Sequence, residues 1–260
     1  MDRRQIRLRI KHVPDAAKLL LRNPSWLKEY LRVMRGQQRT ERAASVHDAV
    51  RVPPVSEARA VSDLLDISEA EYRSAVGSLW KPEPPDAGPL SDWNAREDLQ
   101  NVVGAVVRLT KPEVVVETGV AMGMTSAVIL AALAENGRGH LHSIDLPALQ
   151  AKPEDFVGRA VPERLRERWT LELGPSRQLL PGIATAVAPI DLTLHDADHS
   201  HEGQLEEYRT VWPHLRSGGV LVSDDVRGPA FVEFADEVDV RPHLVAEAED
   251  KAPVGILRKP

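Results

Sequence analysis

The stretch EVVVETGVAMGMTSA (113–127) decides the fold of this 260-residue chain. Its first part, EVVVE (113–117), is short, apolar and rich in β-branched residues, which predicts a buried strand. Gly119 and Gly123 follow, and a helix rich in Ala and Leu is predicted over 123–135. A strand that turns through glycines into a helix is typical of a ligand-binding turn in an α/β sheet. The simpler interpretation is an ordinary tight turn.

Downstream of this turn the chain alternates between strands and helices. Further strands are predicted at 140–145, 169–173, 190–196, 218–225, 241–248 and 253–259. Helices are predicted at 176–186 and 200–214. The alternation predicts a mostly parallel sheet of seven strands covered by helices on both faces. Too few residues join the last two strands for a parallel crossover, so we expect them to form an antiparallel hairpin.

The N-terminal third of the chain reads differently. Residues 1–42 predict a helical arm, and residues 43–78 hold a second helical stretch, clearest in DLLDISEAEYRSAVGSLW (63–80). A helix is also predicted over NAREDLQNVVGAVVRLT (94–110), after the proline-rich segment KPEPPDAGPLSD (81–92). We therefore expect two parts: an N-terminal helical arm or cap with its linker over residues 1–90, and an α/β domain over residues 91–260.

Composition excludes several classes of protein. The chain has no cysteine, which excludes disulfides, Cys-ligated zinc and iron–sulfur clusters. No apolar stretch is long enough to span a membrane, and the N-terminus lacks the apolar segment of a secretory signal. We expect a cytoplasmic protein that contacts no membrane.

Charge is unevenly distributed along the chain. Residues 1–42 hold twelve Lys or Arg and four Asp or Glu, a net charge of +8, whereas the whole chain carries −6. The remainder is therefore strongly acidic. We interpret the basic arm as a helix that packs on the acidic core or on a second subunit, which favours a homo-oligomer. Binding of nucleic acid is the less favoured alternative.

Two acids at predicted strand ends suggest a particular ligand. Glu117 ends the first strand, where it suits a cationic or amine-bearing ligand better than a pyrophosphate. Asp145 ends the second strand, 28 residues later, where an acid can accept hydrogen bonds from ribose hydroxyls. A helix cap is the alternative for Asp145. Ala121 interrupts the G-x-G-x-x-G pattern, which disfavours a nicotinamide dinucleotide.

More acids follow the fourth and fifth strands, in LHDADHSHEGQ (194–204) and SDDV (223–226). The carboxyl ends of neighbouring parallel strands meet at one edge of the sheet. Carboxylates gathered there repel one another unless a cation compensates them, and Mg²⁺ or Mn²⁺ prefers such oxygen ligands. Helix capping is the alternative for part of this set. The four aspartates are Asp196, Asp198, Asp224 and Asp225.

Histidines are concentrated in the same segment, at His195, His199 and His201. A zinc site is disfavoured, because Ala197 stands where a His-x-His-x-Asp-His pattern needs its second histidine. His199 is better motivated as a general base, because the ordinary pKa of histidine suits proton removal near neutral pH. A structural role is the alternative.

Together these motifs resemble the class I S-adenosylmethionine-dependent methyltransferases. More narrowly, they resemble the metal-dependent sugar O-methyltransferases typified by macrocin O-methyltransferase, and their cephalosporin-hydroxylase-like relatives. The resemblance covers about residues 93–260. VVVETGVAMGMTS matches the first motif of the family, HSIDLP the second, and DADH with GGVLVSDD the segments that bear the metal and the base.

The resemblance implies a Rossmann-like fold, a bound S-adenosylmethionine, Mg²⁺ and the following site. The base would be His199 or Asp198. Pro175 stands where such families carry an acid, which leaves Ser176 and Arg177 as substitutes near the adenine. The ligands of the metal would be Asp196, Asp224 and Asp225. The cofactor-binding residues would be Glu117, Thr118, Gly119, Gly123, Thr125, Ser126, Asp145, Ser176 and Asp196.

The implied activity is O-methylation of a hydroxyl on a small molecule, with a sugar of a secondary metabolite favoured as acceptor. Two alternatives stay open: a methyltransferase that works without a metal, and a hydroxylase-like relative of the same fold.

Overall fold

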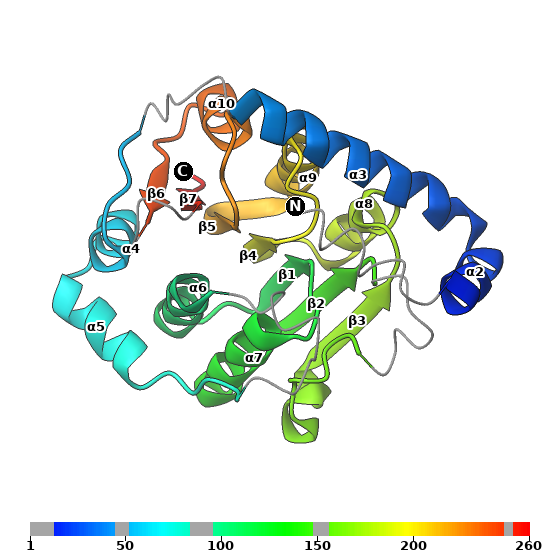
Figure 1. The fold of residues 1–260 in the computed structure, drawn as a ribbon. Coiled ribbons are helices and arrows are strands. Elements are labelled where there is room, and N and C mark those ends of the chain that lie inside the picture. Colours follow the sequence, from blue (N-terminus) through cyan, green and yellow to red (C-terminus); the bar gives the residue numbers. More distant parts are fainter. Residues whose placement is uncertain (1–12, 45–51, 84–95, 148–155, 247–251) are drawn as a thin grey trace.

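The computed structural model describes residues 13–44, 52–83, 96–147, 156–246 and 252–260 (Figure 1). A single seven-stranded sheet forms its centre, in the order β3-β2-β1-β4-β5-β7-β6. Strands β1 to β5 are parallel, and β7 pairs antiparallel with both β5 and β6. The strands are β1 (Val114–Thr118), β2 (His140–Asp145), β3 (Trp169–Leu173), β4 (Ile190–His195), β5 (Leu215–Ser223), β6 (His243–Val245) and β7 (Val254–Arg258). The predicted parallel sheet with an antiparallel hairpin is confirmed.

Helices cover both faces of the sheet (Figure 1). They are α2 (Val13–Arg22), α3 (Pro24–Ala44), α4 (Glu57–Leu65), α5 (Glu69–Gly77), α6 (Glu97–Thr110), α7 (Met124–Asn136), α8 (Ser176–Val187), α9 (His201–Val211) and α10 (Ala230–Glu237), with the 3₁₀ turns η3 (Glu163–Arg168) and η4 (Trp212–His214). Among the described residues, no helix has the length and apolar character needed to cross a membrane.

Alternating residues of the strands divide the core into two layers, as the two-residue period of a strand requires. On β1, Val115 packs in the cluster that includes α4, α6 and α7. The next residue, Val116, packs in the cluster that includes α8, α9 and α10. Val220 and Leu221 of β5 divide in the same way. The sheet is therefore buried on both faces, which explains why its central strands read as continuous apolar runs.

The order of the strands in the sheet has a topological switch point between β1 and β4. From β1 it continues outward to β2 and β3, and it then returns to place β4 on the other side of β1. Open α/β sheets bind ligands at the carboxyl ends of strands beside such a switch point. The loops that follow β1, β2, β4 and β5 therefore define the edge where a site is expected.

The helical stretch predicted over 63–80 is two helices rather than one. Asp66 adopts a left-handed conformation (φ 58°) and ends α4. Ser68 then starts α5 with a capping box, in which its hydroxyl accepts from the Glu71 backbone and the Glu71 carboxylate accepts from the Ser68 backbone. The apolar periodicity runs through this corner, which is why the sequence pattern did not resolve it. The boundary expected near residue 90 lies outside the described residues.

The N-terminal arm packs on the body of the same chain. Figure 1 shows α3 lying across the helices of one sheet face, and α3 contacts α9 directly. Two ion pairs join them: Arg32 with Asp198 at 3.2 Å, and Arg39 with Glu202 at 3.8 Å. The interpretation of a basic arm on an acidic core agrees with this contact.

Gly119 sits where the ends of β1 and β4 come closest. Its φ is +85°, and a Cβ at this position would lie 1.9 Å from the backbone oxygen of Asp196. Gly137 has a similar left-handed φ of +70° but no atom within 4 Å of its would-be Cβ. Alanine substitutions at the two glycines can therefore separate two free-energy costs, that of the left-handed backbone conformation and that of the clash with Asp196.

We expect Gly119→Ala to destabilise the fold much more than Gly137→Ala. The left-handed conformation alone costs about 1 kcal/mol for alanine. The clash at Gly119 adds roughly 1–3 kcal/mol or more, because the Asp196 backbone has to move. Chemical denaturation of both variants measures the difference. Equal losses in the free energy of unfolding would show that the backbone of Asp196 can move away from the added methyl group without a measurable energetic penalty.

Candidate active site

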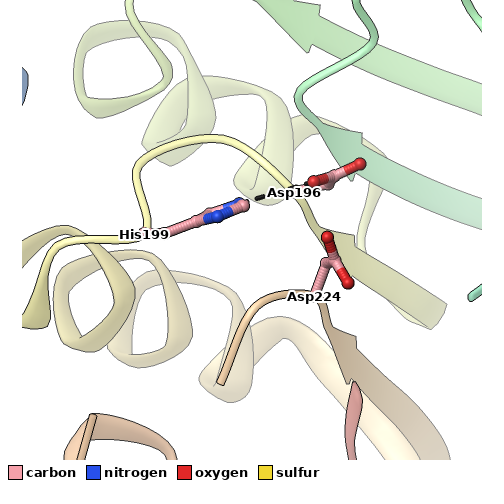
Figure 2. Close-up of side chains that lie close together, drawn as sticks. All are labelled: Asp196, His199 and Asp224. Carbon is pink, nitrogen blue, oxygen red and sulfur yellow. Dashed lines mark ion pairs between the residues drawn. The ribbon is translucent and has the colours of Figure 1, made fainter. Parts of the chain in front are cut away.

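Three side chains converge at the carboxyl edge of β4 and β5. Asp196 follows β4 and Asp224 follows β5, and the two strands pair side by side up to His195 and Ser223. His199, on the loop after Asp196, points back toward both (Figure 2). One ligand atom from each of Asp196, His199 and Asp224 lies within 4.8 Å of the others. We call these three residues the acidic triad.

The acidic triad is incompletely satisfied. The Nε2 atom of His199 and the Oδ1 atom of Asp224 are buried and have no hydrogen-bond partner. Burial and the nearby charge of Asp196 raise the pKa of Asp224 to about 7. Arg96 approaches Asp224 Oδ1 only to 4.0 Å. The donor set of two carboxylates and one imidazole fits a divalent cation.

Asp225, the third predicted metal ligand, lies outside the triad, on the Nδ1 side of the His199 ring. Its Oδ2 atom is 3.1 Å from Nδ1 of His199, and Arg227 contacts its other oxygen. Burial favours a higher pKa for Asp225, but the hydrogen bond and charge of His199 outweigh it and lower the pKa. Asp225 adopts a left-handed φ of 52°, a conformation in which aspartate is enriched.

His199 is held between two carboxylates. Its Nε2 atom is 3.4 Å from Asp196 Oδ1, while Asp225 engages Nδ1. Burial favours a lower pKa for His199, but the hydrogen bond of Asp225 and the nearby carboxylate charges of Asp196 and Asp225 outweigh it and raise the pKa well above the ordinary value. The imidazole is thus oriented by Asp225 and directs Nε2 into the triad.

Asp198, the alternative base, does not join the triad. Its Oδ1 atom accepts from the Ser200 backbone at 3.1 Å, and its Oδ2 atom faces the Arg32 guanidinium at 3.2 Å. The side chain is 4% exposed. Burial raises its pKa, against the opposing effects of Ser200 and Arg32. Ser200 is the N-cap of α9.

The other two histidines of the segment point elsewhere. His195 Nδ1 is 2.7 Å from Glu207, and His201 Nε2 is 2.7 Å from Glu233. Among the described residues, His199 is the only histidine that lies close enough to Asp196 and Asp224 to share a metal ion with them. A zinc site built from several histidines therefore has no geometric support.

Glu207 of α9 connects three elements of the site, and its role was not predicted. Its carboxylate accepts from Thr118 at the end of β1 and from Ser176 at the start of α8, and it contacts His195 at the end of β4. Burial favours a higher pKa for Glu207, but the charge and hydrogen bond of His195 outweigh it and lower the pKa. Thr118 and Ser176, both predicted to contact the cofactor, thus have hydroxyls engaged within the protein.

Glu117 is fully buried at the end of β1. Its Oε2 atom accepts from Ser126 at 2.7 Å and from Ser143 at 2.6 Å, and its Oε1 atom has no partner. Burial, together with the charges of Asp196 and Asp145, raises its pKa to about 8 despite these hydroxyls. A cationic ligand at Oε1 would favour the charged carboxylate. Ser126, another predicted cofactor contact, serves here to hold Glu117.

The glycine turn and Asp145 are joined directly. Asp145 Oδ1 accepts from the backbone of Val120 at 3.0 Å and of Ala121 at 3.3 Å. Ala121 has a φ of +47°, so it adopts the left-handed conformation that glycine would take without strain. Ala121 therefore occupies a position of the turn where the backbone conformation favours glycine.

Gly123 and Thr125, two further residues predicted to bind the cofactor, differ in their surroundings. Gly123 is closed off by protein, because a Cβ there would lie 2.8 Å from the Cα of Gly158. Thr125, in the first turn of α7, has a buried hydroxyl with no hydrogen-bond partner. Gly123 thus permits close packing of the chain, while Thr125 keeps a polar atom available to a ligand.

Three residues of the site carried no recognisable signal in the sequence. Arg32 comes from α3, Arg96 from the start of α6 and Glu207 from α9. Each reaches the site from a helix through tertiary packing, and each belongs to a residue type that is common on exposed helix faces. Glu207 is buried, whereas Glu202 and Arg209 of the same helix are exposed, and no local sequence pattern marks this difference.

Residues 116–226 match a protein family described as a methyltransferase domain. The matched segment runs from β1 to just beyond β5, so it contains the glycine turn, Asp145 and the acidic triad. No curated protein has a matching sequence.

Solved structures share the fold at low sequence identity. The O-methyltransferase from Bacillus cereus in complex with SAH is 14% identical with a TM-score of 0.52, covering 80% of this chain and 92% of that one. The SAH-bound methyltransferase PaMTH1 of Podospora anserina is 13% identical with a TM-score of 0.51, covering 86% and 95%. The SAM-bound O-methyltransferase TomG of Streptomyces achromogenes, involved in tomaymycin synthesis, is 16% identical with a TM-score of 0.51, covering 86% and 99%.

At these identities the structural likeness shows the fold, which is that of class I methyltransferases. The family match and the fold together confirm the prediction of a methyltransferase enzyme.

Proposed function

We propose that this chain is an S-adenosylmethionine-dependent O-methyltransferase assisted by a divalent cation, most simply Mg²⁺. The observation that carries the proposal is the acidic triad, which stands beside the glycine turn of a methyltransferase domain. Structural neighbours described as O-methyltransferases with SAM or SAH support the cofactor and the reaction. The motif resemblance favours a small-molecule hydroxyl as acceptor, on a sugar of a secondary metabolite.

The residues around the glycine turn fit the cofactor. S-adenosylmethionine, when bound, supplies a methyl group activated by a positively charged sulfonium. Asp145, oriented by the backbone of Val120 and Ala121, would accept the ribose hydroxyls. Glu117 offers its unpartnered Oε1 atom to the cationic amino group, and Thr125 offers its unpartnered hydroxyl. A positive ligand next to Glu117 compensates the charge that burial disfavours.

Asp196 and Asp224 would hold the cation. Mg²⁺, when bound, supplies positive charge that lowers the pKa of a nearby hydroxyl. The two aspartates stand at neighbouring strand ends, so the sheet fixes their separation. Arg96, which pairs with Asp98 at 2.8 Å, stands 4.0 Å from Asp224 Oδ1 and offsets part of the negative charge there. Asp225 would act on the site through His199.

His199 is the proton acceptor in this proposal. Asp225 holds Nδ1, which leaves Nε2 to receive the acceptor's proton. The raised pKa of His199 reflects uncompensated carboxylates, so a divalent charge beside Asp196 would lower it toward the range useful to a base. Asp198 is unsuited to this role, because Arg32 and Ser200 occupy its two oxygens.

One observation favours a second candidate, a methyltransferase that works without a metal. His199, when protonated, is itself a cation between Asp196 and Asp225 and compensates part of their charge. In that case the two aspartates shape the pocket, and His199 has to lose its own proton before it can accept one from the methyl acceptor.

The role of Asp224 can be tested by calorimetry on metal-free protein. We expect S-adenosylhomocysteine and Mg²⁺ to bind the wild type, and Asp224→Asn to abolish the Mg²⁺ site while changing the affinity for S-adenosylhomocysteine little. Asp63→Asn, which alters a surface ion pair with Arg59, is the control and should change neither. Cofactor binding with no Mg²⁺ site, even with acceptor present, would select the metal-free candidate.

The variant His199→Gln tests whether His199 acts as the general base or as a ligand of the metal. A base contributes about 10²–10⁴-fold to turnover, so the variant should lose activity in that range and keep Mg²⁺ affinity. Release of S-adenosylhomocysteine from a screen of glycosides and phenols measures the first quantity, and calorimetry the second. Loss of the Mg²⁺ site along with activity would make His199 a metal ligand instead.

Glu117→Gln should weaken cofactor binding and stabilise the unliganded protein. The folded protein binds the Glu117 proton more tightly than the unfolded chain, since its pKa is raised from 4.5 to about 8. The stability linked to this group is therefore present below about pH 4.5 and is lost as the pH rises through 8.

We accordingly expect the melting temperature of Glu117→Gln to exceed that of the wild type by more at pH 8.5 than at pH 5. Calorimetry should show weaker binding of S-adenosylhomocysteine by the variant. A pH-independent difference in melting temperature would mean that Glu117 is charged in the folded protein and already compensated.

A further inference from the structure

Helix α3 reaches several strand ends through one buried stripe. Trp26, Tyr30 and Val33 are buried and lie four and three residues apart, so they share one face of the helix. Trp26 and Tyr30 pack in a cluster with Leu173 at the end of β3. The Tyr30 hydroxyl donates to the backbone oxygen of Pro147, just beyond β2. The helix therefore lies over the same edge of the sheet as the site.

Arg32 extends this contact to the loop after β4. Its Nη2 atom is 3.2 Å from Oδ2 of Asp198, an atom that has no hydrogen-bond partner, so the Arg32 charge is what compensates it. Glu29, one turn earlier and also buried, holds the guanidinium in place through Nε at 2.9 Å and Nη2 at 2.6 Å. Asp198 is thereby clamped between α3 and the first turn of α9.

Two glycines permit the close approach that this clamp needs. A Cβ on Gly36 of α3 would lie 2.8 Å from the Cβ and Oγ atoms of Ser200. A Cβ on Gly203 of α9 would lie 2.4 Å from the carboxyl carbon of Asp198. Neither glycine has a left-handed φ, so both are explained by space rather than by backbone conformation. The packing of α3, the loop and α9 is fitted around Asp198.

The clamped loop carries two members of the acidic triad. Asp196 begins it, fixed by a backbone hydrogen bond of 2.8 Å to Thr118, and Ser200 ends it as the cap of α9. His199 lies between the clamped Asp198 and that cap. Any shift of Asp198 is therefore passed to His199 through a single peptide unit.

We propose that Arg32 is a positioning residue of the catalytic centre: by holding Asp198, it fixes the loop that carries both Asp196 and His199 relative to Asp224. This inference rests on the proposed metal-assisted function. It makes α3 a part of the site, although α3 lies more than 150 residues before the loop in the sequence.

A surface ion pair would not serve this purpose, because exposed pairs contribute little and leave side chains free. Asp198 is different, because its carboxylate is buried. Loss of the Arg32 charge leaves a buried anion uncompensated, and the loop has to move to hydrate it. The outer-sphere partners of metal sites typically change metal affinity about 10–100-fold when removed.

The experiment measures Mn²⁺ affinity by electron paramagnetic resonance on the full chain. Arg32→Ala should weaken Mn²⁺ binding about 10-fold or more, and Arg32→Lys should restore part of it, because lysine keeps the charge but not the planar contact with Glu29. Arg39→Ala is the matched control: Arg39 lies on the same helix and pairs with α9 through Glu202, but at 3.8 Å on the surface. It should leave the affinity unchanged.

The double variant Arg32→Ala/Asp198→Asn distinguishes positioning from simple charge balance. The neutral amide that replaces the Asp198 carboxylate removes the buried anion, so the melting temperature should return toward that of the wild type. The affinity for Mn²⁺ should stay low, because the loop has lost its anchor on α3. Recovery of both quantities together would overturn the proposal and reduce Arg32 to a neutralising charge.

Hydrogen exchange tests the positioning role of Arg32 independently of metal binding. If the wild type binds no Mn²⁺, the metal-assisted function fails, but exchange of the backbone amides of residues 196–200 still reports on the loop. Exchange of these loop amides that is accelerated more than exchange of the core amides of β4 in Arg32→Ala, but not in Arg39→Ala, supports the positioning role. Equal exchange in the two variants overturns it.

Discussion

Burial of carboxylates at one edge of the sheet is the constraint on which the rest of this structure depends. A buried anion is costly unless a cation or several donors compensate it. Glu207 is compensated by His195, Asp198 by Arg32, and Asp225 by His199. In each case the partner comes from a different element, so the electrostatic requirement also fixes the packing of these elements.

Two acids at this edge remain poorly compensated. Glu117 has no cation partner among the described residues, and the pKa of Asp224 stays near 7 although Arg96 stands 4.0 Å away. One lies beside the glycine turn and the other in the acidic triad. The two places thus correspond to the two ligands of the proposed reaction, a cationic cofactor and a divalent metal. A ligand that binds only the folded chain stabilises it by mass action, so the unliganded protein is the less stable form.

Much of this arrangement could be predicted from the sequence because strand ends obey simple rules. The short apolar runs located the strands, and the parallel order placed the ends of β4 and β5 together. Asp196 and Asp224 follow directly from that reasoning. The direction of each side chain in a loop does not: Asp196 and Asp198 are two residues apart in DADH, yet one faces the triad and the other faces α3.

Long-range partners were beyond the sequence for a different reason. Arg32 and Glu207 lie on helices where charged residues are normally solvent-exposed, and no local pattern distinguishes a buried one. Ala121 shows the opposite case, since its left-handed backbone is the one expected of the turn although the residue is not glycine. The sequence motif therefore did not reveal the left-handed conformation of Ala121 or the helix that covers this edge.

The same helix explains where part of the basic charge of the N-terminus goes. Arg32 pairs with a buried aspartate and Arg39 with Glu202, so these two positive charges of α3 are directed at the acidic body of the chain. Leu27 and Leu31, one turn apart on α3, are more than 40% exposed. Apolar side chains on the outer face of a helix whose inner face is anchored are compatible with the homo-oligomer, which stays a prediction. If a second subunit covers them, the clamp on Asp198 would be supported from both sides of α3, and the geometry of the site would depend on assembly.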